Sequence, residues 1–270
     1  MKIKTEEFDV IRKLVYERAG ILLEAGKEYL VESRMRGLLR NQAIESVEVL
    51  VESLKRGVFE TEELVVDALT TNETSFFRDG SPWELLRNKI IPEMIERNKA
   101  TRKLDIWCAA SSSGQEPLTL AILLCEDFPE LASWHVKITA TDISEDMLTR
   151  CKTGLYSQLE VSRGLPAELL VRYFDKSGVK WQVGKQLSDM IGYHRLNLTE
   201  SLPMMRPRDL VMIRNVLIYF DNETKCDILT RISRVMQKRG FLMLGTAETA
   251  RDVPFERQSF EKITYYEVAD

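Results

Sequence analysis

The sequence lacks two features that would direct the chain to or across a membrane. It has no run of about eighteen or more apolar residues, the length that a transmembrane helix needs. Its start, MKIKTEEFDVIRKL, has neither the continuous apolar stretch nor the small-residue cleavage site of a signal peptide. We therefore expect a cytoplasmic protein without membrane insertion.

Histidine and closely spaced cysteine are also scarce. The chain has 2 histidines, and its 4 cysteines never form a CxxC pair: they are Cys108, Cys125, Cys151 and Cys226. Zinc sites usually draw on clustered cysteine and histidine, whereas dispersed thiols are typical of proteins kept reduced in the cytosol. We predict no metal site.

A basic excess is missing as well. The 38 lysines and arginines are outnumbered by 42 aspartates and glutamates, which gives a formal net charge of −4. Binding to nucleic acid usually requires a basic face. We expect no nucleic-acid partner, and any anionic substrate must be attracted by local arginines.

The first part of the chain has the pattern of a small helical domain. Phe8, Ile11, Leu14 and Val15 recur at helical spacing until Gly20 ends the segment. Further helices are predicted at about 28–40, 46–54 and 62–69. We assign residues 1–70 to this domain and 71–102 to a linker and the first helix of the next domain.

From residue 103 onward the pattern changes to that of an α/β domain, 103–270. The apolar runs LDIWCA, HVKITATDI, 209–214 and FLMLGTA alternate with helical stretches, including a helix at 222–237 ending near Gly240. This order indicates a parallel sheet with crossover helices, and the tail at 255–268 predicts a terminal antiparallel pair. An insertion at about 155–193 is expected to add a helix and a small antiparallel hairpin.

Two predicted strand ends carry features of a ligand site. The first strand runs into Cys108-Ala-Ala-Ser-Ser-Ser-Gly114, whose small residues let a ligand approach the backbone, although a tight turn alone would also explain them. The second ends at Asp142, which could accept hydrogen bonds from ribose hydroxyls or simply precede a helix capped by Ser144. Together they fit NAD, another nucleotide or S-adenosylmethionine.

Polar residues near these strand ends add to the candidate site. Glu116 lies in the first turn of a helix, where it either complements the helix dipole or faces a cationic ligand group. The segment TTNETSFFRD carries Asn72, Thr74 and Arg78 around a phenylalanine pair, so it is at once a linker and a possible cleft wall.

A third strand end interrupts an apolar run with a charge. Arg214 and Asn215 follow the strand at 209–214, a costly place for a charge without a partner, and Tyr219 lies about one turn beyond. A structural ion pair with a core tyrosine is the alternative to a functional site.

These motifs together resemble the CheR-type chemotaxis receptor methyltransferases. The resemblance covers nearly the whole chain and includes TTNETSFFRD, WCAASSSGQEPLTLA, ATDISEDML followed by KTGLY, NLT at 197–199, IRNVLIYF and the late GTAE. It implies a class I, Rossmann-like methyltransferase sheet with an inserted antiparallel subdomain and an all-helical N-terminal domain. It also implies S-adenosyl-L-methionine as cofactor, and esterification of glutamate side chains on chemoreceptors as the reaction.

The resemblance also assigns site residues. The positions that match cofactor contacts are Asn72, Thr74, Arg78, Glu116, Asp142, Asn197, Leu198, Arg214 and Asn215. Those expected nearest the reacting carboxylate are Arg78, Arg214 and Tyr219. Receptor helices would be bound through Arg34, Arg36 and Arg40 of the second helix, although a solvated helix face would explain these arginines equally well.

The sequence departs from the family pattern in places. Gln115 and Leu118 stand where many members have Glu and Tyr, which should alter packing more than chemistry. The hairpin DKSGVKWQV is shorter than in members that dock on a receptor's C-terminal tether, which predicts tether-independent recognition. Nothing in the sequence requires more than a monomer.

Three other functions compete with this interpretation. A methyltransferase for another substrate would have much the same cofactor site, and a non-catalytic cofactor-sensing adaptor would retain the helical domain. A nicotinamide dehydrogenase is disfavoured because GxGxxG and a suitably placed histidine are missing.

Overall fold

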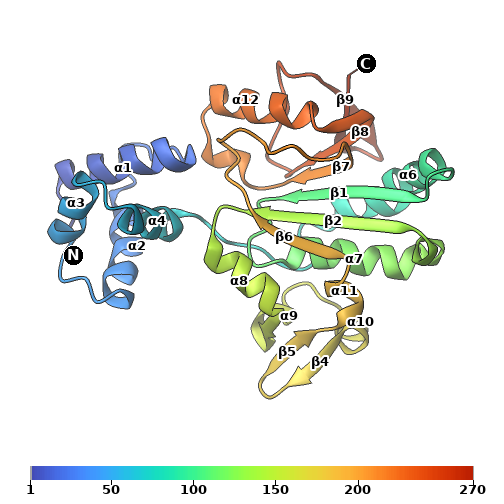
Figure 1. Cartoon of the computed structure of the whole chain (residues 1–270), viewed down its shortest axis with the longest axis horizontal. Coiled ribbons are helices and arrows are strands. Elements are labelled where there is room, and N and C mark those ends of the chain that lie inside the picture. Colours follow the sequence, from blue (N-terminus) through green and yellow to red (C-terminus); the bar gives the residue numbers. More distant parts are fainter. Residues whose placement is uncertain (1, 270) are drawn as a thin grey trace.

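The computed structural model describes residues 2–269, which form a helical domain and a larger α/β domain joined by an extended segment (Figure 1). The helical domain consists of α1 (Thr5–Ala19), α2 (Glu28–Asn41), α3 (Val47–Lys55) and α4 (Phe59–Leu69). Phe8, Ile11 and Val15 of α1 are buried in its core, as their helical spacing predicted. α1 ends where Gly20 adopts a left-handed φ of 67° and donates its N–H to the Tyr16 carbonyl.

The α/β domain is built on a seven-stranded sheet in the order β6-β2-β1-β7-β8-β10-β9. The first five strands in this order are parallel, and β10 runs antiparallel between β8 and β9. The predicted parallel sheet with a terminal antiparallel pair is confirmed. The strands are β1 (Lys103–Ala109), β2 (His135–Asp142), β6 (Ile191–Arg195), β7 (Arg208–Ile213), β8 (Met236–Leu244), β9 (Phe255–Phe260) and β10 (Ile263–Val268).

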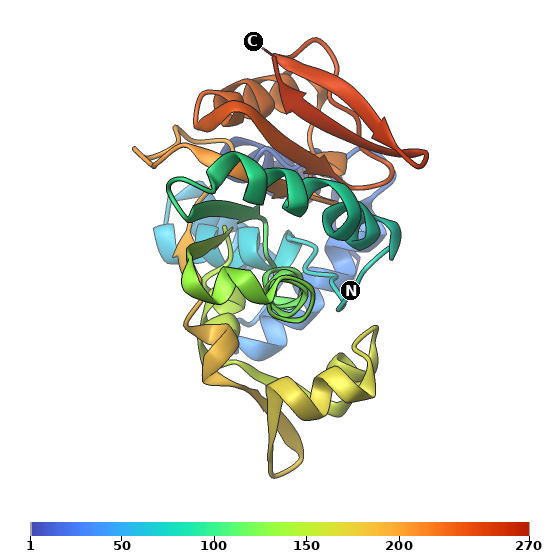
Figure 2. The ribbon, with the colours of Figure 1, turned by 90° about the vertical axis from the view of Figure 1, so that its right-hand side faces the viewer.

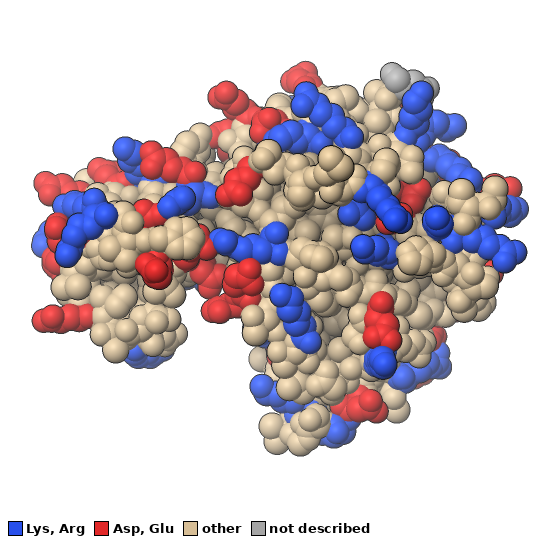
Figure 3. Space-filling view, viewed as in Figure 1, with Lys and Arg blue, Asp and Glu red and all other residues tan. Residues whose placement is uncertain are grey.

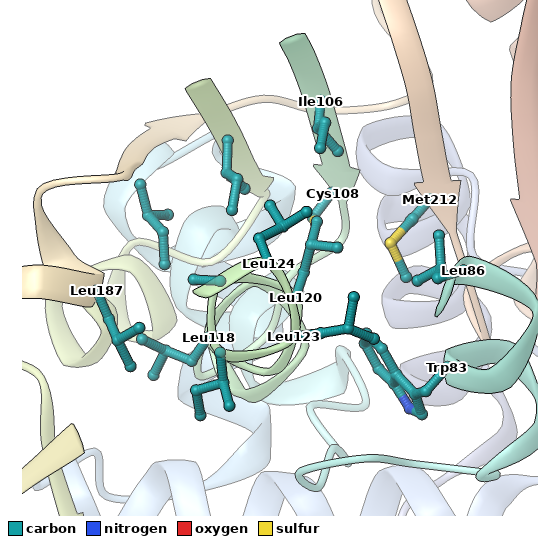
Figure 4. Packing of buried hydrophobic residues seen from close by; sticks show 14 of the residues in the cluster. Trp83, Leu86, Ile106, Cys108, Leu118, Leu120, Leu123, Leu124, Leu187 and Met212 are labelled. Atoms are coloured by element: carbon teal, nitrogen blue, oxygen red, sulfur yellow. The ribbon is translucent and has the colours of Figure 1, made fainter. Parts of the chain in front are cut away.

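Helices cover both faces of this sheet, which is why its central strands are buried and mostly apolar toward their carboxyl ends. Along β1, Ile106 and Cys108 face one core, and the alternating residues Trp107 and Ala109 face the other. The first core contains α7, and Figure 4 shows leucines of this helix packed beside Trp83 and Met212. The helices on this side include α5 (Ser81–Leu85), the π-helical turn η1 (Leu86–Ile90), α6 (Ile91–Asn98) and α7 (Gln115–Asp127).

The core on the opposite face of the sheet lies under α12 (Asn222–Ser233). The antiparallel pair β9–β10 forms the edge of the sheet beyond β8 (Figure 2). Three shorter helical segments complete the main domain: the 3₁₀ helices η2 (Pro129–Ser133) and η3 (Leu217–Tyr219), and α8 (Glu145–Thr153). The sequence thus places one apolar layer on each side of the sheet.

A small subdomain lies below the main sheet in the view of Figure 1. Its three antiparallel strands lie in the order β3-β5-β4, and Leu155–Ser157 adds a strand to the hairpin that the sequence predicted. The elements are β3 (Leu155–Ser157), α9 (Gln158–Ser162), α10 (Ala167–Tyr173), β4 (Phe174–Ser177), β5 (Lys180–Val183) and α11 (Lys185–Ser188).

This subdomain holds the segment that links the two domains. The Arg163 carbonyl accepts a hydrogen bond from the Phe76 N–H at 3.1 Å. The neighbouring Gly164 has φ +90°, and a Cβ there would lie 1.9 Å from the Phe76 carbonyl oxygen. Only glycine lets the two backbones approach so closely.

Two boundaries differ from the sequence predictions. The helix expected at 222–237 ends at Ser233, because Met236 already pairs with Arg208 as the start of β8. The expected insertion at 155–193 also overlaps β6, whose residues Ile191–Arg195 pair with β2 as an edge strand of the main sheet. In both places, pairing with a distant strand overrides the local pattern.

Candidate functional site

A cavity lies at the carboxyl ends of β1, β2 and β7, and its empty space, together with the open solvent at its mouth, is about 920 Å³. Ligands of open α/β sheets bind at this edge. The wall includes every residue that the sequence analysis assigned to the cofactor or to the reacting group: Asn72, Thr74, Arg78, Glu116, Asp142, Asn197, Leu198, Arg214, Asn215 and Tyr219.

The loop after β1 has an unusual backbone. Ala110 and Ser112 have left-handed φ values of 58° and 50°, and Gly114 follows with φ 93°. Two buried side chains hold the loop from behind: the Cys151 thiol donates to the Ser112 carbonyl at 3.2 Å, and the Tyr156 hydroxyl donates to the Ser113 carbonyl at 2.7 Å. Burial raises the pKa of Cys151 to about 12 and that of Tyr156 well above its ordinary value, so both stay protonated as donors.

Asp142 is fixed at the end of β2 by two backbone donors. Its Oδ2 accepts the Ser112 N–H at 2.7 Å, and its Oδ1 accepts the Ser144 N–H at 3.0 Å. Burial raises the pKa of this carboxyl, and the N–H donors oppose part of the rise. Each carboxylate oxygen can accept a further hydrogen bond. The expected helix cap is also present, since Ser144 accepts the Met147 N–H at 3.2 Å.

Arg214 forms the centre of a buried ionic group. Its side chain is 1 % exposed, and its Nη1 and Nη2 donate to Glu116 Oε2 and Asp79 Oδ2, each at 2.8 Å. Burial raises the pKa of Glu116, and the Arg214 guanidinium opposes part of that rise. With both carboxyls ionised, this three-residue group carries one net negative charge, and it lies beside the Arg78 guanidinium, which also lines the cavity.

The linking segment lies along the cavity from Thr70 to Arg78. Phe76 anchors it, fully buried and packed edge-to-face on Tyr156 with ring centroids 5.8 Å apart. The Asn72 carbonyl accepts a hydrogen bond from the Ser112 hydroxyl at 2.9 Å. The Arg78 guanidinium donates to the Glu73 carbonyl at 2.8 Å. The linker thus serves both as a core anchor and as a wall of the cavity.

The helical domain also contributes to the site, through Ala19 and Ile21, which line the cavity. Main-chain contacts fix them there. Leu22 donates its N–H to the Tyr219 carbonyl at 2.8 Å, and Asn197 Nδ2 donates to the Arg18 carbonyl at 2.7 Å. This contribution could not be predicted from the sequence, because nothing in the helical pattern of α1 indicates which domain its end touches.

Two other polar residues at the site were missed. Asp79 pairs with Arg214, and its position next to Arg78 was the available signal. Glu248 lies in the motif GTAE and accepts backbone hydrogen bonds from Gly245, Asn215 and Ile218. Its role depends on two strand ends that meet only in the folded chain.

The predicted receptor-binding arginines lie on α2, away from the cavity wall. Arg36 and Arg40 are exposed and Arg34 is half-buried. In the part of the chain that the structure describes, no carboxylate lies within ion-pairing distance of these three. The face in Figure 3 carries both signs of charge interspersed.

Residues 2–269 offer neither a membrane span nor a metal centre. No helix there has the length and apolarity to cross a bilayer. No cluster of three or more potential metal ligands of the His, Cys, Asp or Glu type occurs within the same residues.

Comparison with known proteins gives matches along most of the chain. Residues 6–70 match the family model "CheR methyltransferase, all-alpha domain", and residues 72–266 match "CheR methyltransferase, SAM binding domain". Chemotaxis protein methyltransferase 1 of Pseudomonas aeruginosa is 40% identical over 94% of each chain. Chemotaxis protein methyltransferase Cher2 of Pseudomonas putida is 41% identical over 92% of each. Among solved structures, the DhpI–SAH complex matches with a TM-score of 0.33 and 12% identity, over 70% of this chain and 75% of that chain.

Proposed function

Because this chain belongs to the CheR methyltransferase family, whose cofactor is S-adenosylmethionine, we propose that it methylates glutamate side chains of chemoreceptors. The products would be glutamate γ-methyl esters and S-adenosylhomocysteine, which makes the enzyme a protein-glutamate O-methyltransferase. It would act as a monomer in the cytoplasm, on the cytoplasmic methylation helices of its receptors.

The observation that carries this proposal is the cavity itself, which gathers all ten assigned residues from the linker and the α/β domain. Asp142 would accept hydrogen bonds from the ribose hydroxyls, because its two backbone donors leave it free lone pairs. The net negative group of Glu116, Asp79 and Arg214 suits the ammonium and sulfonium of the methionine moiety. The remaining cofactor contacts would come from Asn72, Thr74, Arg78, Asn197, Leu198 and Asn215.

The reaction needs no general base. A glutamate side chain has an ordinary pKa of about 4.3, so it is ionised at neutral pH. One carboxylate oxygen attacks the methyl carbon in line, a C–O bond forms, and the C–S bond breaks with its electron pair passing to sulfur. The negative carboxylate and positive sulfonium become a neutral ester and a neutral thioether.

Orientation is then the main contribution of the protein. Holding the two reactants in line can supply roughly 7–11 kcal/mol in favourable cases. We assign this role to Arg78 and Tyr219, which line the cavity, and to Arg214 as the residue that fixes Glu116. A tight ion pair between an arginine and the substrate carboxylate would stabilise the ground state and slow the step.

Receptor recognition would fall to the helical domain at 1–70. Arg34, Arg36 and Arg40 are cations without an internal carboxylate partner among the described residues, which suits a helix that carries several glutamates. Residues 71–102 and 103–270 would form the cofactor cleft and the methyltransferase domain. The short β4–β5 hairpin supports recognition without a C-terminal tether.

The test uses the full chain, radiolabelled S-adenosylmethionine and a panel of receptor cytoplasmic fragments, with alkali-released methanol as the readout. Base-labile label on a fragment, lost in Arg78→Ala, is the expected result. A variant with Arg34, Arg36 and Arg40 all changed to alanine should lose labelling while keeping its affinity for S-adenosylhomocysteine. If no fragment is labelled although S-adenosylhomocysteine binds, the chain acts on another substrate or is a sensing adaptor.

A further inference from the structure

Two neighbouring strands end side by side next to the cavity. β7 and β8 are parallel, with Ile213 paired to Leu244, so the segments after them leave the sheet together. The first segment begins with Arg214 and Asn215 and leads into the 3₁₀ helix η3 (Leu217–Tyr219). The second carries Gly245 and Glu248. The first segment contributes to the cavity wall through Arg214, Asn215 and Tyr219, whereas Gly245 and Glu248 do not line it.

Glu248 joins these two segments through its carboxylate. Its Oε2 accepts the N–H of Gly245 at 2.7 Å and the N–H of Asn215 at 2.8 Å, and its Oε1 accepts the N–H of Ile218 at 3.3 Å. The residue is 8 % exposed. A buried carboxylate with several backbone donors is strongly held in place, and it holds those donors in return.

The backbone turns sharply at this point. Asn215 has a left-handed φ of 58°, a region that asparagine adopts more readily than other non-glycine residues, and its N–H is held there by Glu248. The surroundings of Gly245 show how closely the segments after β7 and β8 approach each other. A Cβ there would lie 2.6 Å from Glu248 Oε2 and 2.8 Å from the Asn215 nitrogen.

We infer that Glu248 is a positioning residue of the methyl-transfer site. It does not line the cavity, but it fixes both ends of the turn that carries Arg214, Asn215 and Tyr219. Through Arg214 it sets the place of Glu116, and through η3 it sets the place of Tyr219. The inference depends on the cofactor and not on the identity of the methyl acceptor.

Two substitutions at this position separate positioning from simple stability. Glu248→Ala removes all three acceptors, and the affinity for S-adenosylhomocysteine, measured by calorimetry, should fall roughly 10- to 100-fold. Glu248→Gln keeps one carbonyl oxygen, which can replace Oε2 and retain both short bonds. Its amide NH2 then faces the Ile218 N–H, so the longest bond is replaced by two opposed donors, and the affinity should fall by less than about tenfold.

Gly245→Ala perturbs the same contact while the Glu248 side chain is kept. The added methyl group would meet both Glu248 Oε2 and the Asn215 backbone nitrogen, so this variant should lose affinity as Glu248→Ala does even if the latter fails to fold. Glu256→Ala, at an exposed position of β9, is the matched control and should bind normally.

Thermal unfolding of each variant shows whether it is folded, so that a loss of affinity can be separated from a loss of structure. Wild-type affinity in folded Glu248→Ala or folded Gly245→Ala would overturn the inference. So would a loss in Glu248→Gln as large as that in Glu248→Ala, because the shared oxygen would then be irrelevant.

Discussion

Replacing Arg214 by lysine tests whether the buried ionic group depends on the shape of guanidinium or only on its charge. The guanidinium uses separate nitrogens for Glu116 and Asp79, each at 2.8 Å, and donates to the Arg78 carbonyl at 3.2 Å. A lysine ammonium is a point charge and cannot reproduce this fork. Arg214→Lys should lose one charged hydrogen bond and one to a carbonyl, roughly 2–4 kcal/mol together.

The assay is thermal unfolding at neutral pH, together with calorimetry of S-adenosylhomocysteine. A chain of this size loses about 2–4 °C in Tm per kcal/mol, so Arg214→Lys should unfold roughly 4–16 °C below wild type. Arg214→Ala removes the cation from a buried pair and should cost about 3–5 kcal/mol. Arg36→Lys on the exposed face of α2 is the control, and its Tm should hardly change.

The loss in Arg214→Ala should depend on pH in a defined direction. Burial raises the pKa of Glu116 and Arg214 opposes that rise, so the pKa rises further once the arginine is gone. The folded variant then binds a proton more tightly than its unfolded chain does. Its stability therefore increases as pH falls through the raised pKa and decreases as pH rises. An equal Tm deficit at pH 5 and pH 8, or a wild-type Tm for Arg214→Lys, would refute the reasoning.

Three further changes test other parts of the site. Tyr219→Phe should lower the rate of methyl transfer more than the affinity for S-adenosylhomocysteine; an unchanged rate would remove its hydroxyl from the reaction. Asp142→Ala should weaken S-adenosylhomocysteine roughly 10- to 100-fold in calorimetry, since it removes a charged acceptor and releases Ser112, and normal binding would argue against the ribose assignment. Gly164→Ala should lower Tm by several degrees, because its methyl group meets the Phe76 carbonyl at 1.9 Å; an unaltered Tm would show that the linker can shift freely.

The strand-end residues could be predicted because parallel strands bring their carboxyl ends to one edge. Asp142 and Arg214 stood out as polar residues that end apolar runs, and both line the cavity. β6 was harder to predict, since Ile191 is its only buried residue and it forms the edge of the sheet. The end of α12 was misjudged because the pattern of Val235 to Arg239 suits a helix until Arg208 pairs with Met236.

The residues that sequence analysis missed have a common physical cause. Asp79 and Glu248 act through partners that are far away along the chain. Asp79 contacts Arg214, 135 positions away, and Glu248 contacts Asn215, 33 positions away. Ala19 and Ile21 are ordinary apolar residues whose importance comes only from where α1 ends. A motif shows which residues are chemically unusual, whereas such supporting residues become visible only once distant segments meet.

The docking of α1 against the cavity limits how this protein can be re-engineered. Ala19 and Ile21 form part of the cavity wall, and the Arg18 carbonyl and Leu22 N–H bind Asn197 and the Tyr219 carbonyl. A truncated chain that begins after the helical domain would open the cofactor site to water. A chimera that takes its helical domain from another family member would also need residues 196–200 that match the new domain. Without them it would gain the new receptor preference but lose affinity for the cofactor.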